Sequence, residues 1–203
     1  MKFNFFVILA SFISFSVSSQ EIADRNLLVK DLDFDNVVDT VYIDLEKSII
    51  VCRLSSQQFK KTESLPIEIL NDNSGINSTK NGFEFFNNWM RAGYRNQFRY
   101  NKKVNKIQLI GMSRYEFGNA ANDGSGESSV NLLTNKYIGN WSYYDYFANN
   151  EEGELIKIPT IKTKLFIKTT YLESFSDSTY FEFADRCSEL YHKYKSITIK
   201  KRN

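Results

Sequence analysis

The sequence of 203 residues has little proline, glycine, cysteine or histidine. Its 2 Pro and 9 Gly exclude collagen-like and low-complexity repeats, and its 2 Cys exclude a small disulfide-stapled fold. A single His excludes zinc sites built from several imidazoles. Neither sign of charge dominates, because the formal net charge is +2 at pH 7, so no global field selects a polyanionic partner. The 17 Phe and 12 Tyr, by contrast, exclude disorder and supply a large apolar core.

The N-terminus is typical of a secretory signal peptide. Lys2 precedes a short apolar stretch, and the small residues Val17 and Ser19 occupy the positions expected just before the cleavage point. The stretch is shorter than the roughly 20 residues that span a bilayer. We therefore expect residues 1–19 to be removed and residues 20–203 to form a single β-rich domain, exported to the periplasm or the extracellular space. An uncleaved anchor is the alternative, and no later segment is apolar enough to span.

The two cysteines allow two readings. Export permits a disulfide between Cys52 and Cys187, which would stabilise the protein by up to about 4–5 kcal/mol because it closes a long loop. Two separate buried thiols are the alternative, since spacing alone does not place the two Cα atoms within bonding reach. The sequence leaves both open.

Apolar residues recur with a period of two along most of the chain, which predicts strands. Three hairpins are expected, over residues 41–54, 99–112 and 129–141, and residues 161–168 alternate as a further strand with one buried face. The predicted fold is mainly β, with antiparallel hairpins in a small propeller-like or sandwich-like domain and a short C-terminal helix.

Two segments depart from this period. Residues 83–94 fit either a short helix or an aromatic strand. Near the end of the chain, apolar residues at helical spacing predict the terminal helix. These residues are Ala184, Cys187, Leu190, Tyr191 and Tyr194.

The most specific motif is a run of aspartates near the start of the mature chain. Asp31, Asp33, Asp35 and Asp39 stand at positions one, three, five and nine of a tight loop, and Val37 offers a backbone carbonyl at position seven. Calcium takes six to eight oxygen ligands, and this spacing supplies them from one turn. The sequence therefore predicts a Ca²⁺ site over residues 31–39.

Position six of the loop is Asn36, the residue that tolerates left-handed backbone dihedrals best after glycine. Four carboxylates within nine residues also repel one another unless a cation lies among them. The alternative is an acidic surface turn in which aspartate side chains cap their own backbone.

The aspartate spacing resembles a known calcium loop. Position twelve is Tyr42 rather than the bidentate Glu of an EF-hand, and a strand is expected after it. Over residues 30–45 the loop is similar to the D-x-D-x-D-G-x-x-D turn of integrin-α and FG-GAP β-propeller repeats, where calcium lies between two strands of a blade. It departs from that pattern in having Asn36 for Gly, a single copy, and no Phe-Gly/Gly-Ala-Pro pair upstream. The exported β domain also resembles propeller-like periplasmic lysozyme inhibitors and immunity proteins, which implies tight binding to a lysozyme-like enzyme.

Residues 118–129 form a long, glycine-rich polar loop, which we interpret as a flexible connection, a pocket rim or a second, looser oxygen site. A carboxylate pair for glycoside hydrolysis can be drawn from its neighbourhood, although 24 acidic residues always offer some pair. The oxygen site would use Asn122, Asp123, Ser125 and Glu127. The carboxylate pair would come from Glu116, Asp123, Glu127 or Asp145.

Two further groups of side chains are candidates for binding. Cations alternate with aromatic rings between residues 91 and 106. This pattern suits an acidic partner surface or glycan carboxylates, and the alternative is an ordinary solvated strand face. Nucleic acid would also fit such a pattern, but export argues against it. A second group would stack on sugars or fill the core. It comprises Trp89, Trp141, Tyr143, Tyr144, Tyr146 and Phe147.

The sequence offers few candidate catalytic residues. His192 is the only histidine, and no Gly-x-Ser-x-Gly elbow accompanies it. The leading hypothesis is an exported, calcium-stabilised protein that recognises a protein or a cell-envelope glycan, without catalytic residues. The alternatives are an envelope glycan hydrolase that uses acidic residues of the 116–127 loop, and a purely structural envelope component.

Overall fold

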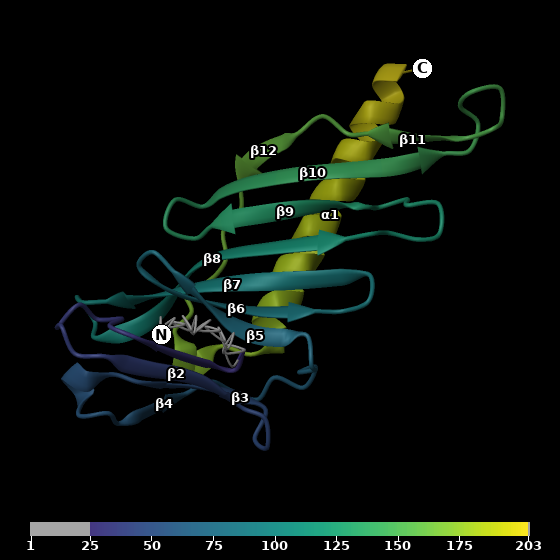
Figure 1. Ribbon diagram of the computed structural model, residues 1–203. Coiled ribbons are helices and arrows are strands. Elements are labelled where there is room, and N and C mark those ends of the chain that lie inside the picture. Colours follow the sequence, from purple (N-terminus) through teal and green to yellow (C-terminus); the bar gives the residue numbers. More distant parts are fainter. Residues whose placement is uncertain (1–24, 203) are drawn as a thin grey trace, which may run out of the picture.

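The computed structural model describes residues 25–202 and is shown in Figure 1. The predicted signal peptide, residues 1–19, lies outside the described residues. The predicted mainly β fold with antiparallel hairpins and a C-terminal helix is confirmed, and it consists of a small sheet, a large sheet and one long helix.

The small sheet holds the aspartate motif. Its strand order is β1-β2-β3-β4, and each neighbouring pair is antiparallel. The strands are β1 (Leu27–Lys30), β2 (Asp39–Asp44), β3 (Ile49–Arg53) and β4 (Lys61–Glu63). The pair β2–β3 is the first predicted hairpin, and the 3₁₀ turn η1 (Ser55–Gln57) follows it.

The large sheet is a meander in which strands adjacent in the sequence are also adjacent in space. From β5 to β10 each strand pairs with the next, and both β11 and β12 pair with the outer side of β10. The strands are β5 (Ser74–Thr79), β6 (Gly82–Asn88), β7 (Ala92–Asn101), β8 (Lys106–Glu116), β9 (Gly126–Asn131), β10 (Lys136–Asp145), β11 (Glu154–Lys157) and β12 (Ile161–Lys164).

The remaining hairpin predictions are confirmed in this sheet, as β7–β8 and β9–β10. The ambiguous segment, residues 83–94, is strand rather than helix: it covers most of β6 and the start of β7. Phe83, Phe85 and Asn87 of β6 are fully buried, whereas Phe86 and Asn88 are only partly buried, which is the alternation of a strand with one core face.

The terminal helix α1 (Asp177–Arg202) has 26 residues and is longer than the short helix expected from the sequence. All five residues that predicted it lie within it. Asp177 stands in its first turn, and Lys200 and Arg202 stand in its last turn, which complements the helix dipole at both ends. At 1.5 Å per residue it is about 39 Å long, enough to cross many strands.

In Figure 1 this helix runs diagonally across one face of the large sheet. Its side chains meet successive strands in order. Tyr180 stacks on Tyr94 of β7, with ring centroids 4.0 Å apart, and Cys187 Sγ lies 3.3 Å from Ser128 Oγ of β9. Further along, Arg202 reaches Glu154 of β11. The helix therefore covers the apolar face that the meander would otherwise expose to water.

One buried cluster joins both sheets and the helix. The segment before α1 contributes Phe175, whose ring lies edge-on to Phe85 and Phe98 at centroid distances of 6.1 and 5.1 Å. The carbonyl of Phe175 also accepts a hydrogen bond from Leu65 N, after the small sheet, at 3.0 Å. This contact ties the small sheet, and with it the aspartate loop, to the core of the large one.

The two cysteines are separate thiols, which decides the question left open by the sequence. Cys52 lies in β3 and Cys187 in α1, and both are fully buried. Burial, helped by the charges of Asp39 and Asp33, raises the pKa of Cys52 to about 12. Burial likewise raises the pKa of Cys187.

We expect both thiols to be inert in the native state, because the thiolate is the reactive form and neither sulfur reaches solvent. Labelling with a thiol reagent at pH 8 should be at least about a hundredfold slower in the native protein than in denaturant, where both thiols should react. Mass spectrometry after timed labelling measures this. Rapid labelling of the folded protein would contradict it.

Candidate metal centre

The aspartate motif lies in the loop that joins β1 to β2. The register pair Lys30↔Asp39 closes the loop at its base, so the chain leaves β1 and returns into β2 within nine residues. Asp31 begins the loop immediately after β1 and Asp39 opens β2. The hairpin geometry thus brings the first and last aspartates of the motif to the same point.

Three of the four predicted carboxylates converge. One carboxylate oxygen each from Asp31, Asp33 and Asp39 lie within 4.8 Å of one another. Asp33 is 3% exposed and Asp39 is fully buried, so the group is directed inward rather than into solvent. Asp35 lies outside this group and is exposed. The structure therefore brings together three of the four aspartates of the predicted site.

Asp39 is the structural centre of the loop. Its Oδ2 accepts hydrogen bonds from Leu32 N at 2.7 Å and Asp33 N at 3.3 Å. Its Oδ1 accepts from the backbone N of Ser55 at 2.7 Å, and it lies 2.9 Å from Ser55 Oγ, whose single proton Asp35 Oδ2 also attracts. This one buried carboxylate joins the aspartate loop to the turn η1, and its donors offset the cost of its burial.

Asp31 and Asp35 cap the loop backbone, as the alternative reading of the motif expected. Asp31 accepts hydrogen bonds from Phe34 N at 2.7 Å and Asn36 N at 3.0 Å. Asp35 Oδ1 accepts from Val37 N at 2.8 Å. The capping does not exclude a metal, because each carboxylate oxygen has two lone pairs.

Asp33 differs from the other aspartates. Its Oδ2 accepts a hydrogen bond from Ser56 Oγ, but its Oδ1 is buried and has no hydrogen-bond partner among the described residues. A buried carboxylate oxygen without a donor is costly, and such atoms are rare in native proteins. This oxygen therefore marks a position where a positively charged ligand would be favoured.

The loop backbone is held in an unusual conformation. Asn36 has a φ of 69°, which confirms the left-handed position six expected from the sequence. Phe34 also has a positive φ, 65°, which the sequence did not suggest. A bulky residue rarely adopts this region, and here it places the Phe34 ring on the surface, 48% exposed.

Two serines belong to the site and escaped sequence reasoning. Ser55 Oγ donates to Asp35 Oδ2 at 2.8 Å, and Ser56 Oγ donates to Asp33. The bond from Ser55, with a further bond from Val37 N, lowers the pKa of Asp35. Both serines follow β3, about 20 residues beyond the motif, so only the pairing of β2 with β3 brings them to the loop.

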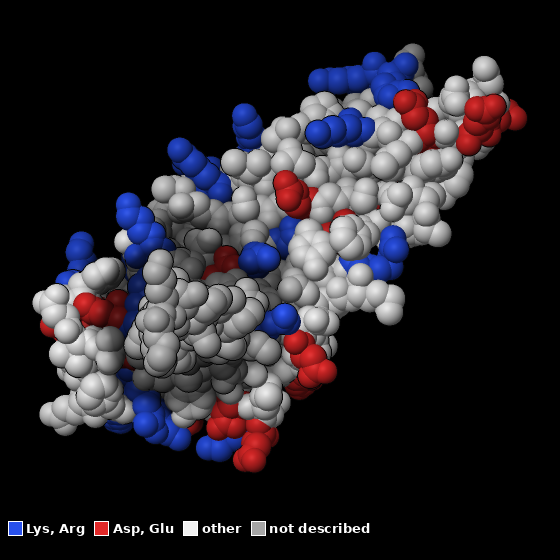
Figure 2. Space-filling model, viewed as in Figure 1, with Lys and Arg blue, Asp and Glu red and all other residues white. Residues whose placement is uncertain are grey.

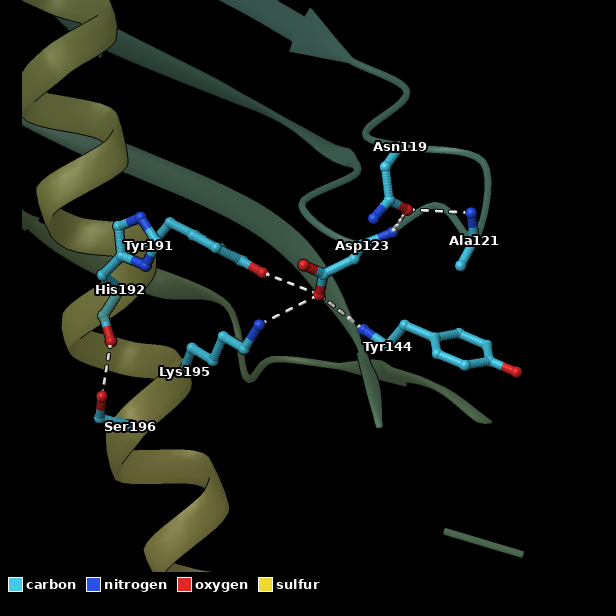
Figure 3. Close-up of polar contacts among 8 residues, drawn as sticks. All are labelled: Asn119, Ala121, Asp123, Tyr144, Tyr191, His192, Lys195 and Ser196. Atoms are coloured by element: carbon cyan, nitrogen blue, oxygen red, sulfur yellow. Dashed lines mark hydrogen bonds and ion pairs between the residues drawn. The ribbon is translucent and has the colours of Figure 1, made fainter. Parts of the chain in front are cut away.

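The carboxylates considered for catalysis have other partners. Figure 3 shows Tyr191 and Lys195 reaching from α1 to Asp123 in the glycine-rich loop. Asp123 Oδ1 accepts from Tyr144 N at 2.8 Å, Lys195 Nζ at 3.1 Å and Tyr191 OH at 3.3 Å. Burial acts to raise the pKa of Asp123, but these donors outweigh it and lower the pKa overall. Asp123 therefore anchors its loop to the helix.

The other acidic candidates are Glu116, Glu127 and Asp145, of which Asp145 accepts a hydrogen bond from Phe147 N at 3.1 Å. Glu116 forms an ion pair with Arg114. Both line a cavity of about 370 Å³ beneath α1, where Asp123 and His192 also lie, whereas Glu127 lines a different pocket. The backbone carbonyl of His192 accepts a hydrogen bond from Ser196 Oγ within the helix (Figure 3).

The aromatic candidates divide between core and surface. Trp141 and Tyr143 are buried, and Trp89 packs edge-on to Tyr94 in the core. Tyr146 and Phe147, after β10, are 60% and 84% exposed. The six rings therefore do not form one sugar-stacking platform.

No family model matches the chain, and no curated protein or solved structure matches it. The resemblance of residues 30–45 to integrin-α and FG-GAP calcium loops, and that of the domain to lysozyme inhibitors, therefore stay predictions. Among the described residues, no helix combines the length and apolarity that crossing a membrane requires.

Proposed function

We propose that this protein is an exported binding protein in which residues 31–39 hold a calcium ion that stabilises the small sheet. The observation that carries the proposal is the buried, unpaired Oδ1 of Asp33 beside the carboxylates of Asp31 and Asp39. A divalent cation would satisfy this oxygen and neutralise the repulsion among the three charges.

The ligand chemistry favours calcium over other metals. The converging groups are all carboxylates, which suit hard cations such as calcium rather than zinc or copper. Asp31, Asp33 and Asp39 would supply the first oxygens, with Asp35 and the carbonyl of Val37 completing the set predicted from the motif. The irregular turn suits the flexible geometry that calcium accepts.

A binding role is favoured over glycan hydrolysis. An acid–base pair needs carboxylates free to exchange protons with a substrate, whereas Asp123 is held by three donors and Glu116 by Arg114. In this proposal calcium supports a surface that recognises an envelope glycan or a protein.

Calcium should raise the melting temperature of the wild-type protein, and EGTA should reverse the rise. At a hundredfold excess over the dissociation constant the expected stabilisation is about 2.7 kcal/mol. Asp33→Asn should abolish this response. In EGTA the same variant should melt at or above the wild-type temperature, because it removes a buried charge that has an unpaired oxygen. Differential scanning calorimetry measures both effects.

Asp72→Asn is the matched control, since Asp72 is exposed and lies outside the loop. It should keep the full calcium response. A wild-type melting curve that is identical in calcium and in EGTA would refute the calcium site, and so would an undiminished response in Asp33→Asn.

A further inference from the structure

A pocket of about 470 Å³ lies between the aspartate loop and the turn that joins β7 to β8. Three cations line it, Arg99, Lys102 and Lys103, together with the rings of Phe34 and Tyr100. None of its lining residues is acidic. Its size falls in the range of small-ligand sites, and its charge suits an anion.

Contacts across the pocket fix its two walls. Lys102 Nζ lies 5.6 Å from the centroid of the exposed Phe34 ring, and Gln57 Nε2 of η1 donates to Asn105 O in the β7–β8 turn at 2.8 Å. In Figure 1 this turn and the loop after β1 lie at the same end of the molecule. The positive φ of Phe34 thus places its ring at the edge of a cationic pocket.

Among the described residues, none of the three pocket cations forms an ion pair. Within residues 25–202, neither Arg99 nor Lys102 nor Lys103 has a carboxylate within 4.0 Å, although six ion pairs form elsewhere in this part of the chain. Lys106, in the same hairpin, shows the contrast, since Glu173 neutralises it. Unpaired cations gathered at one concave site attract an anionic ligand.

The positive charge continues along the margin of the large sheet. Leu133, in the turn between β9 and β10, lines the pocket, and Lys136 follows it at the start of β10. Lys136 stands directly opposite Lys164 of β12, and Lys162 lies two residues before Lys164. Like charges placed opposite one another on paired strands are destabilising. Figure 2 shows Lys and Arg side chains following the upper left margin of the molecule.

We propose that the pocket and these lysines bind an acidic polysaccharide whose carboxylates are spaced along a sugar chain. We call the surface the basic track. It comprises Arg99, Lys102, Lys103, Lys136, Lys162 and Lys164. The inference deepens the proposed binding function, on which it rests, by naming the chemical class of the partner.

The uncharged lining of the pocket favours a sugar over other polyanions. The rings of Phe34 and Tyr100 offer apolar faces against which a pyranose ring packs. The amides of Asn81, Asn101 and Gln108 offer both donors and acceptors for hydroxyl groups. The flanking cations then bind carboxylates, and their separation along the margin fits an extended chain rather than a single small anion.

Calcium in the neighbouring loop would strengthen this binding. The four loop aspartates carry a formal charge of −4 beside the pocket, and one calcium ion reduces it to −2. An anion then meets less repulsion, so its affinity should be several-fold higher in calcium than in EGTA. Because binding free energies are reciprocally linked, the saccharide should raise calcium affinity by the same factor.

The test is isothermal titration of the mature protein with a hyaluronan oligosaccharide, which carries one uronic acid per repeat. The neutral chitin oligosaccharide of equal length is the comparison. We expect binding of the acidic chain only, weakening as salt rises. The double variant Lys102→Gln with Lys103→Gln should lower the affinity for the acidic chain at least about tenfold, because it removes two of the cations that would bind carboxylates. Its calcium-dependent melting shift should be retained and at least as large as that of the wild type, because removing two cations beside the loop lowers the repulsion of calcium.

Lys200→Gln with Lys201→Gln is the matched control, because it removes the same charge from two exposed neighbours at the end of α1. It should bind as the wild type does. The proposal would be overturned if the control lost as much affinity for the acidic chain, or if the neutral chain bound equally well. Tighter binding of inorganic phosphate, polyglutamate or single-stranded DNA would also overturn it. No binding by a protein that calcium does stabilise would refute the track alone, whereas binding without any calcium response would refute the calcium site and leave the track.

Discussion

Asp39→Ala is expected to lower the free energy of unfolding by about 3–5 kcal/mol in EGTA, and by more in calcium, because Asp39 is also a proposed calcium ligand. The substitution leaves the backbone N–H groups of Leu32, Asp33 and Ser55 without their acceptor in a buried position. Each such loss costs about 1–3 kcal/mol. Urea unfolding at pH 7, followed by circular dichroism with and without calcium, measures the effect.

Asp35→Ala provides the comparison for this result. Asp35 is exposed, and its bonds to Ser55 Oγ and Val37 N lie at the surface, so its removal should cost less than about 1 kcal/mol in EGTA. If Asp39→Ala proved no worse than Asp35→Ala in EGTA, Asp39 would not be the structural centre of the loop.

Phe183→Ala is expected to destabilise the protein by about 3–5 kcal/mol. Phe183 lies on the buried face of α1 and is fully inaccessible to solvent within the shared core. Its loss removes apolar contact area and leaves a cavity that the packed sheet cannot fill. Denaturant titration gives the change in stability, and near-ultraviolet circular dichroism reports the packing of the surrounding rings.

Phe181, two residues earlier in the same helix, is 44% exposed and gives a matched control. Phe181→Ala should cost less than about 1 kcal/mol, because 44% of the residue already contacts water. Similar losses for the two variants would contradict the orientation of α1 on the sheet.

The strands were predictable because their signal is local. A hairpin with one buried face repeats every two residues, and residues 41–54 and 99–112 carry that repeat within short spans. The length of α1 was not predictable in the same way. The burial of its first turns depends on the strands that they cross. Tyr180, for example, is covered by Tyr94 and contacts Arg114, so the helicity of these turns depends on tertiary packing.

The candidate metal centre shows the same difference between local and long-range signals. Asp31, Asp33 and Asp39 were found because a single turn presents them at fixed spacing. Ser55 and Ser56 were not found, since they reach the loop only through the pairing of two strands. The burial of Asp33, on which the proposed metal site depends, likewise became visible only in the fold.

The glycine-rich loop shows how a long-range contact changes the reading of a local pattern. Its composition suggested a flexible connection, a pocket rim or a second oxygen site. Asp123 and Gly124 line the cavity beneath α1, as the pocket-rim alternative expected, and Asp123 is also bound by Lys195, which lies 72 residues further along the chain. No window of sequence around the loop contains that partner.

The position of α1 after all the strands sets the order in which the molecule can be completed. Strands β5 to β10 pair as soon as each successive hairpin is made, but their apolar face has no cover until the 26 residues of α1 follow. At about 5–20 residues per second, synthesis leaves that face open for seconds, and incomplete chains with exposed apolar surface tend to aggregate. A chain broken off before Asp177 would stay in that state, so its ribosomal products would be substrates for chaperones and proteases rather than a smaller working domain.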